Sequence, residues 1–380
     1  MNSGMYKNAF TCGIPNSNEV GNIFAAALGV VAGNADKGLE SLADVTPEDN
    51  VKAQEMIDQG KITVELSGIT SRIFIEATVE TEEDKAIVTI RDSHTNITKI
   101  IVNDKVELET EDEKKTEEDG GEEESHSIHK YTLQQLYDYV TTVDIEEIRF
   151  INEAYKVNLE LFHEGLENPR TTFARQLLAI NNGKEVSDDE QKTASLMCNA
   201  AIEARVIGLD KPAMSITGSG AHGIIATMPL YAAYKVNGYT EEQLLRATAL
   251  SYLVCMYIKE YSGRLSAFCG CAIAAGSGMA CALVYLRGGT VEMMAHTLNN
   301  MASSITGMIC DGGNQGCTMK GVAAVDAAYK SVEFAMNGIY ISEVHGINGN
   351  TPEETMRNMG LMLHLEWLAQ RKQLLRFLKT

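Results

Sequence analysis

Five of the eight cysteines of this chain lie between Cys269 and Cys317, in a stretch that is poor in charge and rich in glycine. Cys310 and Cys317 flank the loop Asp-Gly-Gly-Asn-Gln-Gly, which is too flexible to serve packing alone. Soft thiolates on a glycine-rich backbone suit an iron–sulfur cluster or a zinc ion. A redox or metal site near Cys271, Cys310 and Cys317 is therefore the leading hypothesis.

Zinc is the main rival of a cluster at these cysteines. A closed structural zinc site prefers four ligands at short paired spacings, whereas here the further ligands come from a separate helix. Three cysteines and an unfilled position favour a cluster with one open iron, which acts as a Lewis acid. Cys269 and Cys271 form Cys-Gly-Cys, and the choice between them stays open. Cys198, Cys255 and Cys281 sit on apolar helix faces and are expected to pack in the core.

A second candidate site is the loop 215–223, with the sequence SITGSGAHG, which precedes an apolar helix. Successive backbone N–H groups at a helix N-terminus can bind a carboxylate or a phosphate. His222 could add a hydrogen bond or transfer a proton. A tight turn between two helices is an equal alternative, because neither a Walker nor a dinucleotide fingerprint is present.

The polar run at 92–96, with the sequence DSHTN, ends a strand and is longer than a hairpin needs. A surface turn is the favoured alternative to a functional loop here. Lys7 precedes the turn-forming segment that begins at Cys12 and carries no signal by itself.

The elements that must position these residues follow from local signals. Thr46-Pro47-Glu48-Asp49 combines an N-cap threonine, a proline at the first helical position and acids in the first turn. It predicts a helix that runs to about Gln59. Four β-branched runs that follow predict strands: Ile62–Leu66, Ile73–Val79, Ala86–Arg91 and Ile97–Val102.

From Thr132 onward the apolar spacing is helical. The segments are 144–165, 187–206, 240–259, 268–286, 291–308 and 317–337. The sequence thus predicts an α+β fold, with a mainly helical domain and a small domain of one helix and about four strands. The predicted divisions are 1–44 as the N-terminal part of the helical core, 45–106 as the small domain, 107–127 as an acidic linker, and 128–380 as the helical domain.

The net charge of −20 over 380 residues argues against nucleic acid and anionic membrane partners. Eight cysteines without a secretory signal indicate a reducing, cytoplasmic location. Residues 265–286 lack charge and are long enough to span a membrane, but their glycine, alanine and serine content favours a buried helix. Such small-residue helices could also form a homodimer interface.

The motifs TGSGAHGI, CGCAIAAGSG and CDGGNQGC together resemble the serine dehydratase α-chain domain. The chain resembles the L-cysteine desulfidase family more closely, through KNAFTCGIPNSNEVGNIFAAALG, GLESLADVTPED, RDSHTNI and TPEETMRNMG. The resemblance runs from about Ser3 to Gly360, and its motifs are specific in combination.

The resemblance implies a 4Fe–4S cluster held by Cys271, Cys310 and Cys317, without pyridoxal phosphate. It implies α,β-elimination from a small L-amino acid, either cysteine to pyruvate, ammonia and sulfide, or serine to pyruvate and ammonia. The residues implied in substrate binding are Gly218, Ser219, Gly220 and His222 for the carboxylate, and Ser93, His94, Thr95 and Asn96 from the small domain. The candidates for the base that removes the α-proton are His94, His222 and Lys7.

Two departures from the family are expected to matter. Relatives carry an upstream Cys-Thr-Glu-Pro segment, which this chain lacks, and Cys12 belongs to a different motif. After Gly360 the sequence no longer follows the family, although a shifted reading frame could encode a family-like ending. These departures lead to the hypothesis of a truncated, frame-shifted product that retains the fold but lacks activity. A nucleotide sequence with no such alternative frame would contradict it.

Overall fold

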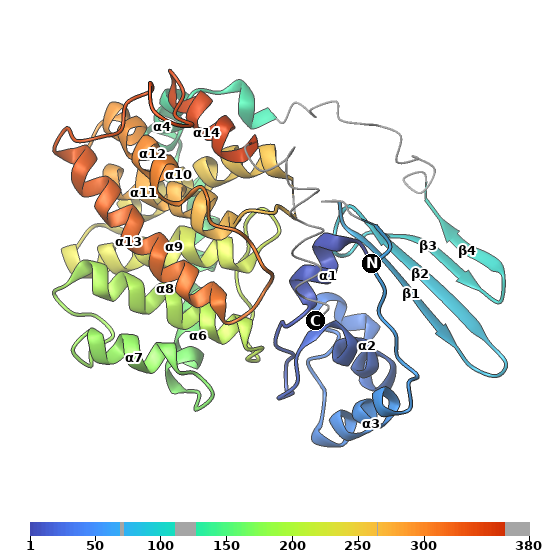
Figure 1. Ribbon diagram of the computed structural model, residues 1–380. Coiled ribbons are helices and arrows are strands. Elements are labelled where there is room, and N and C mark those ends of the chain that lie inside the picture. Colours follow the sequence, from blue (N-terminus) through green and yellow to red (C-terminus); the bar gives the residue numbers. More distant parts are fainter. Residues whose placement is uncertain (69–71, 111–126, 264, 362–380) are drawn as a thin grey trace.

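The computed structural model describes residues 1–68, 72–110, 127–263 and 265–361. It has a helical body beside a smaller part that carries three helices and a sheet (Figure 1). The predicted α+β class is confirmed, because the chain is mainly helical with one four-stranded antiparallel sheet among the described residues. Most of the predicted acidic linker, at 111–126, and the divergent C-terminus, at 362–380, lie outside the described residues.

The helical body is built around one large hydrophobic core. Its α-helices are α4 (Leu133–Thr142), α5 (Ile145–Ile148), α6 (Asn152–Glu167), α7 (Phe173–Ile180), α8 (Glu190–Val206), α9 (Gly220–Asn237), α10 (Glu241–Ser262), α11 (Gly276–Leu286), α12 (Val291–Ile305), α13 (Gly316–Met336) and α14 (Pro352–Leu361). Short turns are η3 (Ser127–Lys130), η4 (Arg149–Ile151) and the π-helical η5 (Cys271–Ala275). Nearly every residue of α11 is buried. No helix in the described part of the chain is long and apolar enough to cross a membrane.

The smaller part begins with α1 (Ser3–Ala9), α2 (Gly21–Ala32), η1 (Ala35–Glu40) and α3 (Pro47–Asp58). The helix predicted from Thr46 is confirmed, since Thr46 Oγ1 accepts from Asp49 N–H and the Asp49 carboxylate accepts from Thr46 N–H. This reciprocal capping satisfies two donors that a helix start leaves unpaired. Helices α2 and α3 and the adjoining loops share a separate core of Ile14, Phe24, Ala27, Leu28, Val45 and Ala53.

The sheet runs β1 (Phe74–Glu80), β2 (Lys85–Arg91), β3 (Ile97–Val102) and β4 (Lys105–Glu109), in that spatial order. The strand predicted at Ile62–Leu66 is wrong. The segment lies outside the sheet and meets the first residues of the chain, where Met1 N donates to Glu65 O at 2.9 Å.

The sequence analysis missed β4, whose last three residues overlap the predicted linker. Asn103 and Asp104, at φ 49° and 64°, form the turn that reverses the chain into β4. Every residue of β4 is exposed, so its acidic side chains remain in water although the strand is paired.

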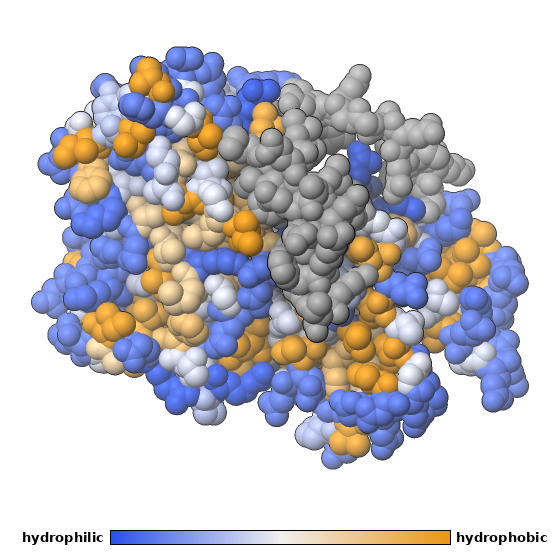
Figure 2. Space-filling view, in the orientation of Figure 1, coloured by the Kyte–Doolittle hydropathy of each residue, from blue (hydrophilic) through white to orange (hydrophobic). Residues whose placement is uncertain are grey.

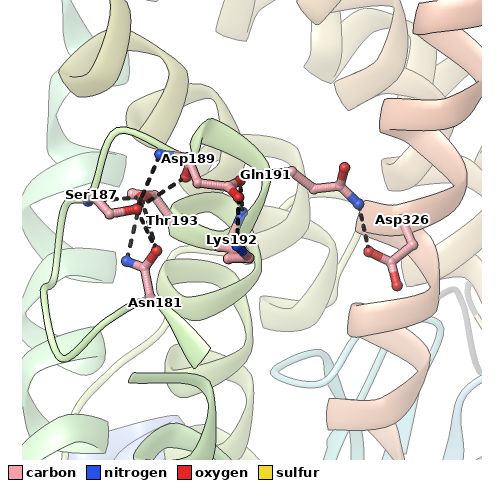
Figure 3. Close-up of polar contacts among 7 residues, drawn as sticks. All are labelled: Asn181, Ser187, Asp189, Gln191, Lys192, Thr193 and Asp326. Carbon is pink, nitrogen blue, oxygen red and sulfur yellow. Dashed lines mark hydrogen bonds and ion pairs between the residues drawn. The ribbon is translucent and has the colours of Figure 1, made fainter. Parts of the chain in front are cut away.

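A cluster of polar side chains fixes the start of α8, the helix that leads to the site described below (Figure 3). Asp189 caps α8 by accepting from Lys192 N–H at 3.0 Å. Beneath it, the buried Ser187 hydroxyl donates to Asn181 Oδ1 at 2.6 Å. Gln191 Nε2 donates to Asp326 Oδ1 at 2.8 Å and so joins α8 to α13. These contacts fix the first turn of α8. Because the helix is rigid, they also define the position of its last turn.

Candidate active site

Two cysteine-bearing segments are joined by a short antiparallel bridge. Cys269 N–H donates to Met308 O at 2.8 Å, and Cys310 N–H donates to Ala267 O at 2.9 Å. These bonds place the start of η5, where Cys271 lies, next to Cys310 although the two are far apart in sequence. The spatial association that the cysteine pattern suggested thus has a backbone cause.

The loop between Cys310 and Cys317 rests on α1. Gly312 has φ +117°, and a Cβ there would lie 2.4 Å from Lys7 O, so only glycine fits. Gly313 N–H donates to Asn8 O at 3.2 Å. The loop then enters the first turn of α13, where the Cys317 thiol donates to Gly312 O at 3.4 Å. The backbone of α1 therefore holds the loop in place.

Cys271 begins the π-helical turn η5, a distortion that often marks functional sites. The sulfur atoms of Cys269 and Cys271 are 3.3 Å apart. Cys269 is only 1% exposed and lies in the core, whereas Cys271 lines a cavity. Of the two cysteines in Cys-Gly-Cys, the geometry favours Cys271 as a ligand.

This cavity has a volume of about 280 Å³ and lies between the helical body and the N-terminal part. The predicted site residues that line it are Cys271, Cys310, Cys317, His94, His222, Gly218 and Ser219. Residues that were not predicted also line it, including Asn8, Cys12, Arg205, Lys259 and Ser266. Three separate sequence motifs thus meet around one space.

Five predicted site residues do not line the cavity: Lys7, Ser93, Thr95, Asn96 and Gly220. Lys7 is buried behind its wall and donates from Nζ to Ser266 O at 3.2 Å. Asn96 closes the turn between β2 and β3, since its Nδ2 donates to Arg91 O at 3.1 Å. From this turn only His94 reaches the cavity.

His222 is held in one orientation by its neighbour Thr217. The Thr217 hydroxyl donates to Ile216 O at 2.7 Å, so its oxygen accepts from Nδ1–H of His222, 2.6 Å away. Nε2 consequently carries the lone pair. A Cβ on Gly270 would lie 2.8 Å from Nε2, which places this lone pair beside the residue that precedes Cys271.

Charge around His222 favours its neutral form. Burial, with smaller contributions from Lys259 and Arg205, lowers the pKa of His222 well below 6.5. Lys259 is 3% exposed and donates to the hydroxyls of Ser262 and Ser266 at 3.2 and 3.3 Å. Burial lowers the pKa of Lys259 to about 8. The lowered pKa of His222 keeps the imidazole neutral and Nε2 able to accept a proton, but as a weaker base than a solvent-exposed histidine.

Sequence reasoning missed Lys259 and Arg205. Each lies at the end of a long helix, and the end of a helix is an ordinary place for a basic residue. The one available signal was that Lys259 ends a largely apolar stretch of α10. The convergence of these cations on one cavity depends on tertiary packing.

The thiols that line this cavity are of the type that an iron–sulfur cluster or a zinc ion uses. Within the described ranges, no three His, Cys, Asp or Glu side chains lie close enough to hold one ion. A cluster spreads its cysteine ligands over different irons, so ligands placed around a cavity can serve it. Hydrogen bonding with Cys269 and burial raise the pKa of Cys271 well above its usual value, and burial raises that of Cys317 to about 12. Binding must therefore release protons.

The sequence profile described as serine dehydratase alpha chain matches residues 36–375. The chain belongs to the serine dehydratase alpha chain family. It is 40% identical over 374 residues to a UPF0597 protein of Clostridium botulinum, covering 98% of this chain and 86% of that one.

Further UPF0597 proteins match over similar lengths. One of Caldanaerobacter subterraneus is 36% identical over 354 residues, covering 93% of this chain and 82% of the relative. One of Bacteroides fragilis is 34% identical over 361 residues, covering 94% and 83%. The resemblance to the serine dehydratase α-chain domain is thereby confirmed at the level of the family.

Proposed function

We propose that this serine dehydratase alpha chain family member catalyses iron–sulfur-dependent α,β-elimination of L-cysteine. Cysteine and water would yield pyruvate, ammonia and hydrogen sulfide. The observation that carries the proposal is the convergence of four thiols, three of them the predicted ligands, and two imidazoles on one cavity. Membership in the family supports a lyase-type reaction.

Cys271, Cys310 and Cys317 would hold a 4Fe–4S cluster through their thiolates. The chemistry that such a group supplies when bound is Lewis-acid polarisation of the substrate's β-thiol or β-hydroxyl and of a carboxylate oxygen. Lys259 and Lys320 would balance part of the added negative charge, since Cys310 and Cys317 respectively interact electrostatically with them.

The chain's own contribution to the reaction is binding and proton transfer. The N–H groups in the first turn of α9, which directly follows Gly218 and Ser219, would orient the substrate carboxylate. His222 would accept the α-proton at Nε2, and His94 is the second candidate from the opposite wall. Elimination breaks the Cβ–S bond and leaves an enamine, which tautomerises and hydrolyses to pyruvate and ammonia.

L-Serine is the alternative substrate, and the family's name favours it. The same residues would serve, with water as the leaving group in place of sulfide. A small thiol or hydroxyl makes little difference to the size of the substrate, so relative rates must decide. A non-catalytic protein that keeps the fold is the remaining alternative.

The decisive experiment is anaerobic purification followed by iron and acid-labile sulfide analysis. Pyruvate release is then compared for L-cysteine and L-serine, and sulfide release is measured for L-cysteine. About four irons per chain with sulfide release supports the proposal. Pyruvate from serine alone supports the dehydratase, and neither iron nor turnover supports a non-catalytic role.

Cysteine variants test the assignment of ligands. We expect Cys271→Ser, Cys310→Ser and Cys317→Ser each to lose most of the bound iron, because serine is a poor ligand for the cluster. Cys269→Ser is the matched control, as its sulfur lies next to Cys271 but outside the cavity lining. Iron retained by Cys271→Ser and lost by Cys269→Ser would reverse the assignment.

A further inference from the structure

Arg205 lines the cavity, although it belongs to none of the sequence motifs that predicted the site. It lies in the last turn of α8, and its side chain lines the cavity together with Ser219 and Cys271. A Cβ on Gly220 would lie 2.8 Å from Arg205 Nε, so the guanidinium packs directly against the start of α9. Arg205 thus flanks the loop implied in carboxylate binding.

The guanidinium of Arg205 has no carboxylate partner among the residues that the structure describes. It makes no hydrogen bond or ion pair to any residue in the described part of the chain, although it is partly buried. The neighbouring Lys259 is also a cation, and both charges lower the pKa of His222. A guanidinium carries five N–H donors in a planar fork, and partly buried charges are normally paired. An anion that enters the cavity would supply a partner for this guanidinium, beside the Cys271 thiol with which Arg205 interacts electrostatically.

We propose that Arg205 binds the α-carboxylate of the substrate. The inference rests on the proposed function, which supplies a small amino acid as the ligand. A planar fork matches the two oxygens of a carboxylate, and a charge-assisted pair of this kind is both strong and directional. Backbone N–H groups at the start of α9 lie on the same side and add to the attraction.

This contact assigns a specificity to the cavity. A compound with the thiol and amine of cysteine but without its carboxylate, such as cysteamine, leaves Arg205 unpaired and is not a substrate. A small carboxylate without a thiol, such as pyruvate, still binds. Neutralising the carboxylate also makes the adjacent α-hydrogen more acidic, which helps the base that removes it.

The test uses Arg205→Met and Arg205→Lys, with Arg149→Met as the matched control on the exposed surface. Iron and acid-labile sulfide are measured first, and then kcat and KM for L-cysteine. Pyruvate binding to cluster-free protein is followed separately by saturation-transfer NMR. We expect Arg205→Met to retain iron, to raise KM by at least about 10-fold and to weaken pyruvate binding. Arg205→Lys should restore part of the affinity for L-cysteine and for pyruvate, because lysine keeps the positive charge but lacks the planar guanidinium donors.

The outcomes separate the two levels of inference. Unchanged KM and unchanged pyruvate binding in Arg205→Met overturn the role of Arg205 while the lyase proposal stands. If Arg205→Met loses iron while Arg205→Lys and Arg149→Met keep it, and pyruvate binding is intact, the carboxylate role of Arg205 is also overturned. In that case Arg205 would stabilise the cluster. Absence of iron and turnover in the unsubstituted protein overturns the proposed function, and pyruvate binding still tests Arg205.

Discussion

At the scale of single residues, Thr217 does two things at once. It occupies the left-handed region at φ 53°, which is unfavourable for a β-branched residue, and its hydroxyl orients His222. A strained backbone that places a side chain on an imidazole is more typical of a functional site than of a plain turn. Of the two readings of the 215–223 loop, this observation favours the functional one.

We therefore expect Thr217→Val to lower kcat by about 10-fold or more, because Nδ1 of His222 loses its acceptor and the ring is free to change tautomer. Thr217→Ser keeps the hydroxyl and should stay near the unsubstituted rate. Nitrogen NMR of the imidazole reports the tautomer directly. Equal rates in the two variants, with an unchanged tautomer, would contradict the role given to Thr217.

At the scale of elements, the start of α7 is tied to the cysteine loop by one buried carboxylate. Glu203 is fully buried and accepts from Thr172 N–H and Ala174 N–H, both at 2.8 Å. Gln315, within the loop that joins Cys310 to α13, donates to the same carboxylate at 3.2 Å. Glu203 thus caps one helix and steadies the loop next to it.

Removing this carboxylate leaves several buried donors without an acceptor. We expect Glu203→Ala to lower the free energy of unfolding by about 3 kcal/mol. Hydrogen exchange across residues 311–316 should accelerate as well. Glu160→Ala, an exposed substitution on α6, is the control and should change stability by less than about 0.5 kcal/mol. If hydrogen exchange in this loop is as slow in Glu203→Ala as in the unsubstituted protein, the position of Gln315 does not depend on Glu203.

Local sequence signals predicted helices and strands better than they predicted which segments pack or pair with one another. The Thr46 capping box and the apolar spacing of the long helices act within a few residues, so the sequence reveals them. Residues 62–66 have the alternation of a strand, but whether a strand pairs is decided elsewhere in the chain. The same limit applies to the cavity, since the motifs named the cysteines and histidines but not the packing that adds Arg205.

At the scale of the whole molecule, two cores of very different size stabilise the fold. The large core spans the helical body, whereas α2, α3 and the loops beside them share a core of six buried apolar residues. Figure 2 shows hydrophobic side chains near the N-terminal helices as well as on the helical body. Val20, Ile23 and Val30 are exposed in the N-terminal part. Regions with few buried contacts open first.

We expect amides of α2 and α3 to exchange with solvent at lower opening free energies than those of α9 and α11, measured by native-state hydrogen exchange. Phe24→Ala should enlarge this gap, because it removes the largest side chain of the small core. Since α1 supports the cysteine loop, iron retention should fall in the same variant. Equal protection in both parts would mean that the two cores unfold as one.

The π-helical turn at Cys271–Ala275 makes the site sensitive to the number of residues in it. A π turn holds one residue more than an α-helical turn, and each residue in a helix advances the direction of the side chains by about 100°. Deleting one alanine would let the turn relax into the regular helix of α11. The residues on the N-terminal side of the deletion would then rotate about the helix axis. Cys271 would then swing away from the cavity, with each cysteine still in the chain. A search for related proteins that keep this chemistry should therefore require the extra residue as well as the cysteines.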